Sequence, residues 1–188
     1  AEGSTSRGKT RDLQKHKTRL EELMEQARKA SKILGVKHID FAGLNDNRMD
    51  SYDLLDIVKL IEKKVAKFCP TLVYTHHRGD LNIDHRVTHD AVLTACRPVN
   101  VEQPKKILTF ETLSSTEWNN PNVNTQFNPQ VFVNIKNQWL KKVAALSVYE
   151  TEMRDFPHPR SIRAIESLAK YRGSTCHFEY AEAFMLVR

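Results

Sequence analysis

The stretch Thr71-Leu72-Val73-Tyr74-Thr75, followed by His76-His77-Arg78-Gly79-Asp80-Leu81-Asn82-Ile83-Asp84-His85-Arg86, decides the predicted fold. The first five residues are β-prone, as expected for a buried parallel strand, and Pro70 ends the helical pattern before them. The rest of the stretch is polar, and a helix-period run begins at Val87. This order of elements indicates an α/β fold, in which loops beyond the carboxyl ends of strands usually bind ligands.

The alternation of helix and strand extends in both directions from this stretch. Apolar spacing predicts helices over 10–34 and from about 51 to 68, the first of them ending at Gly35. Further strands and helices are expected at 36–41, 107–111, 131–135, 137–153, 161–171 and 183–187. We predict one domain over 1–188, an α/β, Rossmann-like fold with a mostly parallel sheet and helices on both faces.

Composition excludes several classes of protein. The chain has 188 residues, 40% of them hydrophobic and only three of them Cys, which argues against coiled coils and disulfide-stapled folds. It has neither a long apolar run nor a signal-peptide pattern, so we expect no membrane span and a cytoplasmic location. A net charge of +6, concentrated over 7–19, fits a nucleic-acid-binding module or a solvated helix face. Self-association into a homo-oligomer is left open.

Several side chains able to bind a metal crowd the polar stretch. His85 and His89 share one helix face, and Asp84 precedes His85. Neutral imidazole with carboxylate oxygen suits zinc, but Arg86 stands where a zincin helix needs its Glu base, which excludes a zincin. A loop whose His and Asp residues only cap the helix and bond one another explains the same cluster, with Asp84 as the N-cap.

The polar stretch resembles the corresponding segment of the PIG-L/LmbE-like family of zinc-dependent de-N-acetylases, which are similar to GlcNAc-PI de-N-acetylase. Further similar features follow in order along essentially the whole chain: Leu34-Gly35-Val36, Asp46, Phe110-Glu111, Ser115-Thr116-Glu117-Trp118, Lys141-Lys142, Arg172-Gly173 and Tyr180-Ala181-Glu182-Ala183-Phe184. The resemblance implies a hydrolase that removes the acetyl group from an N-acetylated amino sugar or its conjugate.

The resemblance also implies a single zinc ion. In the family a His and an Asp of an N-terminal Ala-His-Pro-Asp-Asp loop bind the ion together with a later His, which corresponds to His85. Asp84 would lie beside this ligand and orient or charge-stabilise an imidazole. The zinc would polarise the acetyl carbonyl and acidify its water, with the second Asp of the N-terminal motif as general base. That motif is not found here, so we expect 1–188 to lack the family's first strand, metal loop and first helix.

The remaining site assignments are less direct. Asn82 stands where many family members have a His, so the catalytic acid is expected to come from elsewhere, with His76 and His77 as candidates, while Asn82 is kept among the catalytic residues. Substrate contacts are expected from Asp80, Asp46, Arg48, Arg86, Trp118 and Glu182. Salt bridges, packing and solvation explain the same residues without a substrate. A metal-free binding or scaffold protein with this fold is the first alternative function, and the basic nucleic-acid-binding module is the second.

Overall fold

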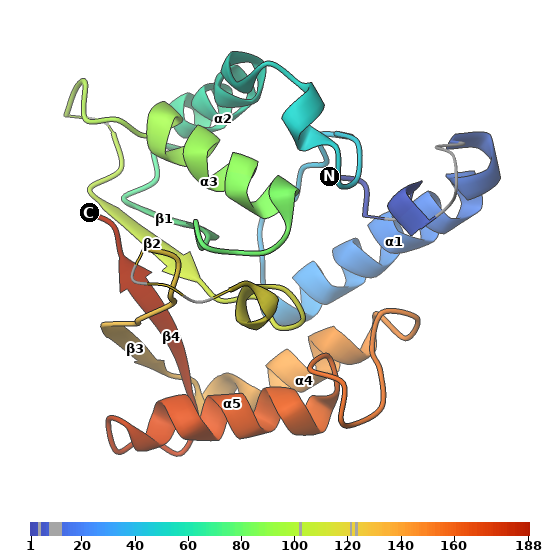
Figure 1. Cartoon of the computed structure of the whole chain (residues 1–188), viewed down its shortest axis with the longest axis vertical. Helices are drawn as coiled ribbons and strands as arrows, with labels where there is room; N and C mark the ends of the chain where they lie inside the picture. The colour runs from blue at the N-terminus through green and yellow to red at the C-terminus, as the bar shows by residue number, and fades with distance from the viewer. Residues whose placement is uncertain (4, 8–12, 102, 121, 123) are drawn as a thin grey trace. The chain divides into compact units, whose positions relative to one another are not determined.

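The computed structural model describes residues 1–3, 5–7, 13–101, 103–120, 122 and 124–188 (Figure 1). Its longer elements are α1 (Leu13–Leu34), α2 (Leu54–Phe68), β1 (Leu72–His76), α3 (Ile83–Ala95), β2 (Lys106–Phe110), β3 (Val131–Asn134), α4 (Trp139–Ser147), α5 (Ile162–Ser174) and β4 (Ala181–Leu186). Short 3-10 helices are η1 (Thr5–Arg7), η2 (Met49–Ser51), η3 (Thr116–Trp118) and η4 (Lys136–Gln138). The predicted α/β class is confirmed.

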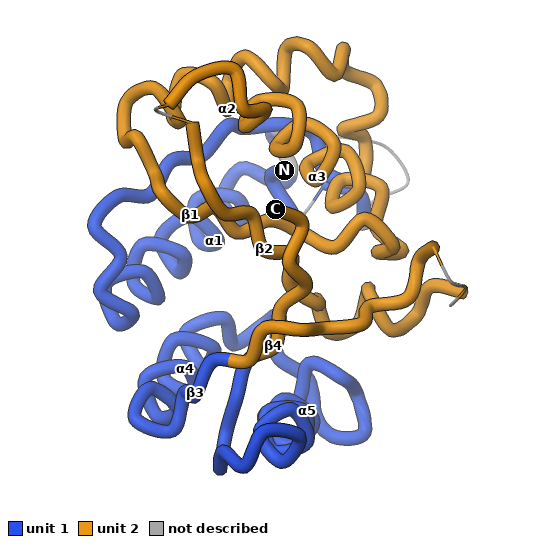
Figure 2. Tube along the Cα trace, turned by 90° about the vertical axis from the view of Figure 1, so that its left-hand side faces the viewer, with its two compact units in different colours: residues 1–46, 133–182 blue, residues 47–132, 183–188 orange. Residues whose placement is uncertain are grey.

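The chain forms two compact units (Figure 2). Unit 1 comprises Ala1–Asp46 and Val133–Glu182, and therefore contains α1, α4 and α5. Unit 2 comprises Asn47–Phe132 and Ala183–Arg188, and contains α2, β1, α3 and β2. The polar stretch after β1 lies entirely within unit 2.

One open sheet contains the four strands in the order β1-β2-β4-β3. Strands β1 and β2 are parallel, with Leu72 opposite Lys106 and His76 opposite Phe110. Strand β4 is antiparallel to β2, so the sheet is mixed rather than mostly parallel as predicted. Because His76 and Phe110 end the two parallel strands side by side, the loops that follow β1 and β2 begin at the same edge of the sheet.

In the core of unit 2, strands β1 and β2 pack against helices α2 and α3. Helix α3 packs on α2 and on β1. The buried cluster consists of Val65, Val92, Cys96 and Ile107, with Ile61, Val73 and Leu93 packed against it. Each fully buried Val or Ile side chain contributes about 1.5–3 kcal/mol, so this cluster fixes where β1 and α3 meet the loop between them. None of the described helices is long and apolar enough to cross a bilayer.

Three local predictions differ from the structure. Segment 36–41 is irregular, and Val36 and Phe41 are 49% and 43% exposed, so the prediction of a strand there is wrong. Helix α4 ends at Ser147, earlier than expected. Gly173 lies inside α5 rather than after it, and a Cβ there would come within 2.5 Å of the carbonyl O of Phe178, so close approach of the chain requires this glycine. The predicted start of α1 at 10–12 lies outside the described residues.

Candidate functional site

Asp80 is the centre of the polar stretch. The side chain is fully buried, and Oδ1 lies 3.0 Å from Nδ1 of His85. The carboxylate also accepts hydrogen bonds from the hydroxyl of Ser115, from Oγ1 of Thr116 at 2.7 Å and from the backbone N–H of Asn82 at 2.8 Å. Burial raises the pKa of Asp80, but the neighbouring groups, first His85 and then Ser115, Thr116 and the backbone of Asn82, outweigh burial and lower the pKa to about 2. Asp80 is therefore an anion at neutral pH.

This geometry gives Asp80 a role other than the expected substrate contact, because the buried carboxylate is already surrounded by donors. A carboxylate at Nδ1 fixes the ring of a His and directs Nε2 to another partner, an arrangement usual at metal-bound histidines. The side chain of His85 is 19% exposed. The structure thus presents one oriented imidazole at the edge of the sheet.

Asp84 binds the loop before α2. Its Oδ2 accepts a hydrogen bond from the backbone N–H of Asn47 at 2.7 Å, and Oδ1 accepts one from that of Met49 at 2.9 Å. The N-cap of α3 is Asn82, whose side chain accepts from the N–H of Asp84 at 2.8 Å. The prediction of Asp84 as the N-cap is wrong, and the carboxylate beside His85 is not Asp84. Asn82 therefore caps α3, and its catalytic role stays a prediction.

We expect Asp84→Ala to lower the free energy of unfolding by about 3 kcal/mol, because two backbone N–H groups lose a charged acceptor. Urea unfolding at neutral pH measures this change. Asp50→Ala, at an exposed Asp of η2, is the control and should change stability by less than about 0.5 kcal/mol. Equal effects of the two substitutions would contradict the assignment.

His76 packs against the oriented imidazole. Its ring stacks on that of His85, with centroids 4.0 Å apart, and lies tilted on Phe110. Burial, followed by the neighbouring charge of His85, lowers the pKa of His76 to about 4. A ring with this pKa is neutral at pH 7, which does not favour the expected role as general acid.

His77 fastens the loop that follows β2. Its Nε2 lies 2.9 Å from the carbonyl O of Thr125, to which it donates, and its ring meets that of Phe127 edge-on at 5.3 Å. The side chain is 4% exposed. Gly79 lies against this contact, and a Cβ there would come within 2.0 Å of the carbonyl O of Thr125. His77 therefore holds this loop, and its catalytic role stays a prediction.

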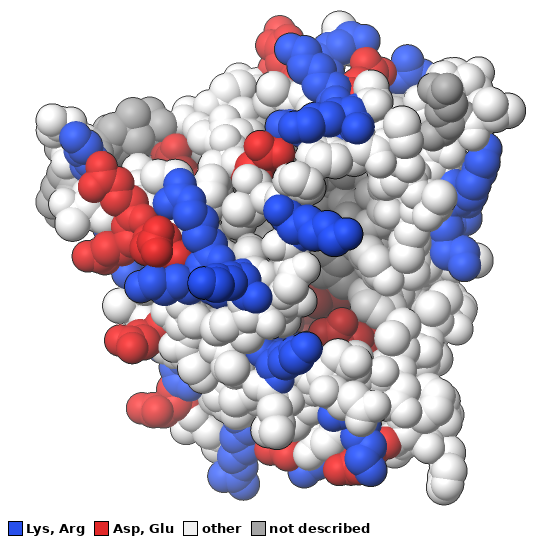
Figure 3. Space-filling model, turned by 180° about the vertical axis from the view of Figure 1, so that it is seen from behind, with Lys and Arg blue, Asp and Glu red and all other residues white. Residues whose placement is uncertain are grey.

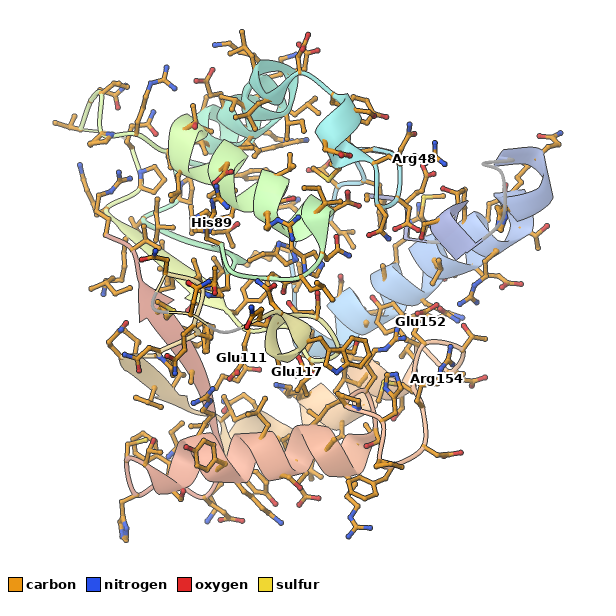
Figure 4. The ribbon with its side chains drawn as sticks, viewed as in Figure 1. Arg48, His89, Glu111, Glu117, Glu152 and Arg154 are labelled. Carbon is orange, nitrogen blue, oxygen red and sulfur yellow. The ribbon has the colours of Figure 1, made fainter. Side chains whose placement is uncertain are left out.

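His89, on α3, is buried in the same unit (Figure 4). Its Nδ1 lies 2.8 Å from the carbonyl O of His76, so this nitrogen donates the hydrogen bond. Burial is the main cause that lowers the pKa of His89 below its usual value. The ring is thus held neutral and ties α3 to the end of β1.

The lowered pKa predicts how stability depends on pH. Because the unfolded chain binds a proton at this His more tightly than the folded chain, we expect stability to fall as the pH drops below about 6.5. His89→Gln should make this fall shallower, and the exposed control His38→Gln should leave it unchanged. Thermal unfolding between about pH 7.5 and pH 5 measures both. A slope that His89→Gln does not reduce would contradict the prediction.

Three other predicted substrate residues lie in unit 2. Arg86 donates through Nη1 to the carbonyl O atoms of Asp80 and Leu81, at 2.9 and 2.6 Å, and so clamps the loop. Arg48 is exposed and stands between the two residues whose N–H groups bind Asp84. Trp118 ends η3 and is 53% exposed.

The other two predicted contacts lie in unit 1. Asp46 is 7% exposed, and its Oδ2 accepts hydrogen bonds from Ser6 N at 3.1 Å and Ser6 Oγ at 2.5 Å. Glu182 forms an ion pair with Nζ of Lys142 at 2.5 Å. Both carboxylates therefore have partners within unit 1.

Sequence reasoning missed Ser115 and Thr116 as the donors that hold Asp80. The signal was present, since Ser115-Thr116-Glu117-Trp118 belongs to the motifs that carry the resemblance, but a role for its hydroxyls could not be read from it. It also missed Thr125, because only the fold brings this loop back to His77.

The donor set for zinc is incomplete among the described residues. His85 fits as one ligand, since Asp80 orients its ring. No group of three His, Cys, Asp or Glu side chains able to hold a metal ion occurs in the part of the chain that the structure describes. A structural or catalytic zinc site needs at least three protein ligands, so these residues do not hold zinc by themselves.

Solved structures share this fold. The conserved protein TT1542 from Thermus thermophilus superposes with a TM-score of 0.70 at 19% identity, over 88% of this chain and 72% of that one. N,N'-diacetylchitobiose deacetylase from Pyrococcus horikoshii superposes with a TM-score of 0.69 at 16% identity, over 89% of this chain and 64% of that one. GalB, the 4-carboxy-2-hydroxymuconate hydratase from Pseudomonas putida, superposes with a TM-score of 0.65 at 18% identity, over 91% of this chain and 73% of that one. At these identities the likeness concerns the fold alone, which serves both deacetylases and a hydratase.

The chain spans about two thirds to three quarters of the length of these neighbours. No curated protein sequence matches it significantly. A family model described as "PIG-L: GlcNAc-PI de-N-acetylase" matches residues 2–96, which is just over half of the chain and includes the Asp80–His85 pair. The chain therefore belongs to the PIG-L family.

Proposed function

We propose that residues 1–188 act as a deacetylase domain that hydrolyses the N-acetyl group of an amino sugar or amino-sugar conjugate. Family membership and the fold shared with N,N'-diacetylchitobiose deacetylase support this reaction class. The observation that carries the proposal is the oriented imidazole, because a buried carboxylate that fixes one His ring nitrogen prepares the other for a metal or a substrate.

Within this proposal His85 is the zinc ligand and Asp80 is its orienting carboxylate. The stacked ring of His76 restricts rotation of His85, and the donors from Ser115 and Thr116 keep Asp80 ionised and in place. Because a zinc site needs at least three protein ligands and the described residues contain no such group, the proposal takes the further zinc donors from outside these residues. Arg48, beside the loop that Asp84 holds, is a candidate contact for the conjugate.

The test uses the full-length protein from its natural source, with its mass measured by mass spectrometry. It is incubated with N,N'-diacetylchitobiose and other N-acetylated amino sugars, and released acetate and bound zinc are quantified before and after chelation. Acetate release that chelation abolishes and zinc restores is the expected result. Full-length protein that releases no acetate from any sugar of the panel would overturn the proposal.

A metal-free binding or scaffold protein is the second candidate, because the described residues lack a three-ligand metal group. It predicts full-length protein without zinc that nevertheless binds an N-acetylated sugar. The basic nucleic-acid-binding module receives less support. Arg19 is engaged by Glu22 and Glu152 at 3.4 and 2.9 Å, and Lys, Arg, Asp and Glu side chains are interspersed on the face shown in Figure 3. Nucleic-acid affinity that falls steeply with salt would revive it.

A further inference from the structure

Two apolar side chains are exposed beside the Asp80–His85 pair. Leu81 is 48% exposed and Trp118 is 53% exposed. The backbone N–H groups of both residues donate to one acceptor, the carbonyl O of Ser115, at 3.4 and 3.3 Å. The two residues belong to different loops, after β1 and after β2, and this shared carbonyl brings their backbones together.

The backbone that carries this pair is held from several sides. The carbonyl O of Leu81 accepts from Arg86 at 2.6 Å. The carboxylate of Glu117, labelled in Figure 4, accepts from the N–H groups of Ser114 at 2.6 Å and Ser115 at 3.2 Å, which braces η3. Exposed apolar residues mark a binding surface when they lie together rather than singly.

We propose that Leu81 and Trp118 form an apolar platform that binds the C–H face of the pyranose ring of the substrate. The inference rests on the proposed deacetylase function and deepens it by naming the sugar subsite. The face of an indole ring is electron-rich and attracts the polarised C–H groups on one side of a sugar ring, while Leu81 widens the apolar area.

The position of the platform supports a place in the same site. Thr116, two residues before Trp118, donates to Oδ2 of Asp80, while Oδ1 of Asp80 contacts His85. One carboxylate therefore supports both the oriented imidazole and the turn that carries the indole.

Polar groups around the platform favour a sugar over an alkyl chain. The guanidinium of Arg86 lies at the backbone of Leu81, and the side chain of Asn119 donates to the carbonyl O of Gly79 at 2.7 Å. An alkyl chain offers no hydrogen-bonding atoms to the Arg86 guanidinium or the Asn119 amide, whereas the hydroxyls of a sugar do.

Fluorescence tests binding without catalysis. Residues 1–188 contain two Trp residues, and Trp139→Phe leaves Trp118 as the only Trp among them. In this variant of the full-length protein, N,N'-diacetylchitobiose should shift the emission to shorter wavelength in a saturable way, and octanoate should not. If Trp139→Phe fails to fold, the difference between wild type and Trp118→Phe gives the same signal. A shift with octanoate alone, or no shift in a protein that deacetylates the sugar, would overturn the platform.

Kinetics separate this inference from the proposed function. Trp118→Ala should raise KM about tenfold with kcat within about twofold, since the platform binds substrate and transition state alike. Trp118→Phe should lie between wild type and Trp118→Ala. Tyr171→Ala, at an aromatic residue of unit 1 that is 61% exposed, is the control and should change neither constant. If Trp118→Ala is active with an unchanged KM, the platform is overturned and the proposed deacetylase function stands. If the sugar shifts the emission but no acetate is released, the platform stands and the proposed deacetylase function is overturned.

Discussion

Asp80→Ala should lower the free energy of unfolding by about 3–5 kcal/mol, because it removes a buried anion and leaves its donors without an acceptor. The hydroxyls of Ser115 and Thr116 and the N–H of Asn82 would all lose this partner. The loops after β1 and β2 would then lose the centre that joins them. Urea unfolding of the variant and the wild type at neutral pH measures the loss.

Asp90→Ala is the matched control for this substitution. Asp90 forms an ion pair with Arg78 at 2.7 Å, but both side chains are more than a third exposed, so its removal should cost less than about 1 kcal/mol. Asp80→Asn should lie between the two variants, since an amide keeps the shape but can accept fewer of the hydrogen bonds. A loss for Asp80→Ala no larger than for Asp90→Ala would show that the buried carboxylate is not the centre of the loops.

The sequence predicted those elements whose signals are local. Apolar spacing and Pro70 bracketed α2, and the β-prone run before His76 placed β1 to within one residue. Segment 36–41 shows the limit of this reasoning. Alternation of apolar and polar residues becomes a strand only when a neighbouring strand completes its hydrogen bonds, and the sequence does not name that neighbour.

The carboxylate that contacts His85 could not be chosen from adjacency along the chain. Asp84 precedes His85, but both lie in the first turn of α3, where consecutive side chains point about 100° apart and do not face each other. Asp80 lies in the loop and turns back to the ring. Asp80 rather than Asp84 contacts His85 because the hydroxyls of Ser115 and Thr116, more than thirty residues away, hold the carboxylate of Asp80. Only the parallel pairing of β1 and β2 brings the loop that carries these hydroxyls alongside.

Under the proposed function, His85→Gln should lower kcat/KM for the N-acetylated sugar at least about a thousandfold, a loss of about 4 kcal/mol of transition-state stabilisation. The substitution removes the imidazole that the buried carboxylate of Asp80 orients. It should change the free energy of unfolding by less than about 1 kcal/mol, because Asp80 keeps its donors Ser115, Thr116 and the backbone N–H of Asn82. Steady-state kinetics, urea unfolding and the zinc content of the purified variant are measured together.

The three readouts distinguish a ligand from a packing residue. If His85 binds zinc, its loss lowers zinc content and activity together, whereas Asp80→Asn lowers zinc affinity only about 10- to 100-fold because orientation, not the donor atom, is lost. His38→Gln, at an exposed His of unit 1, should leave all three unchanged. Full zinc content and full activity in His85→Gln would mean that the Asp80–His85 pair serves the fold alone, and the chemistry would then have to lie outside the loops after β1 and β2.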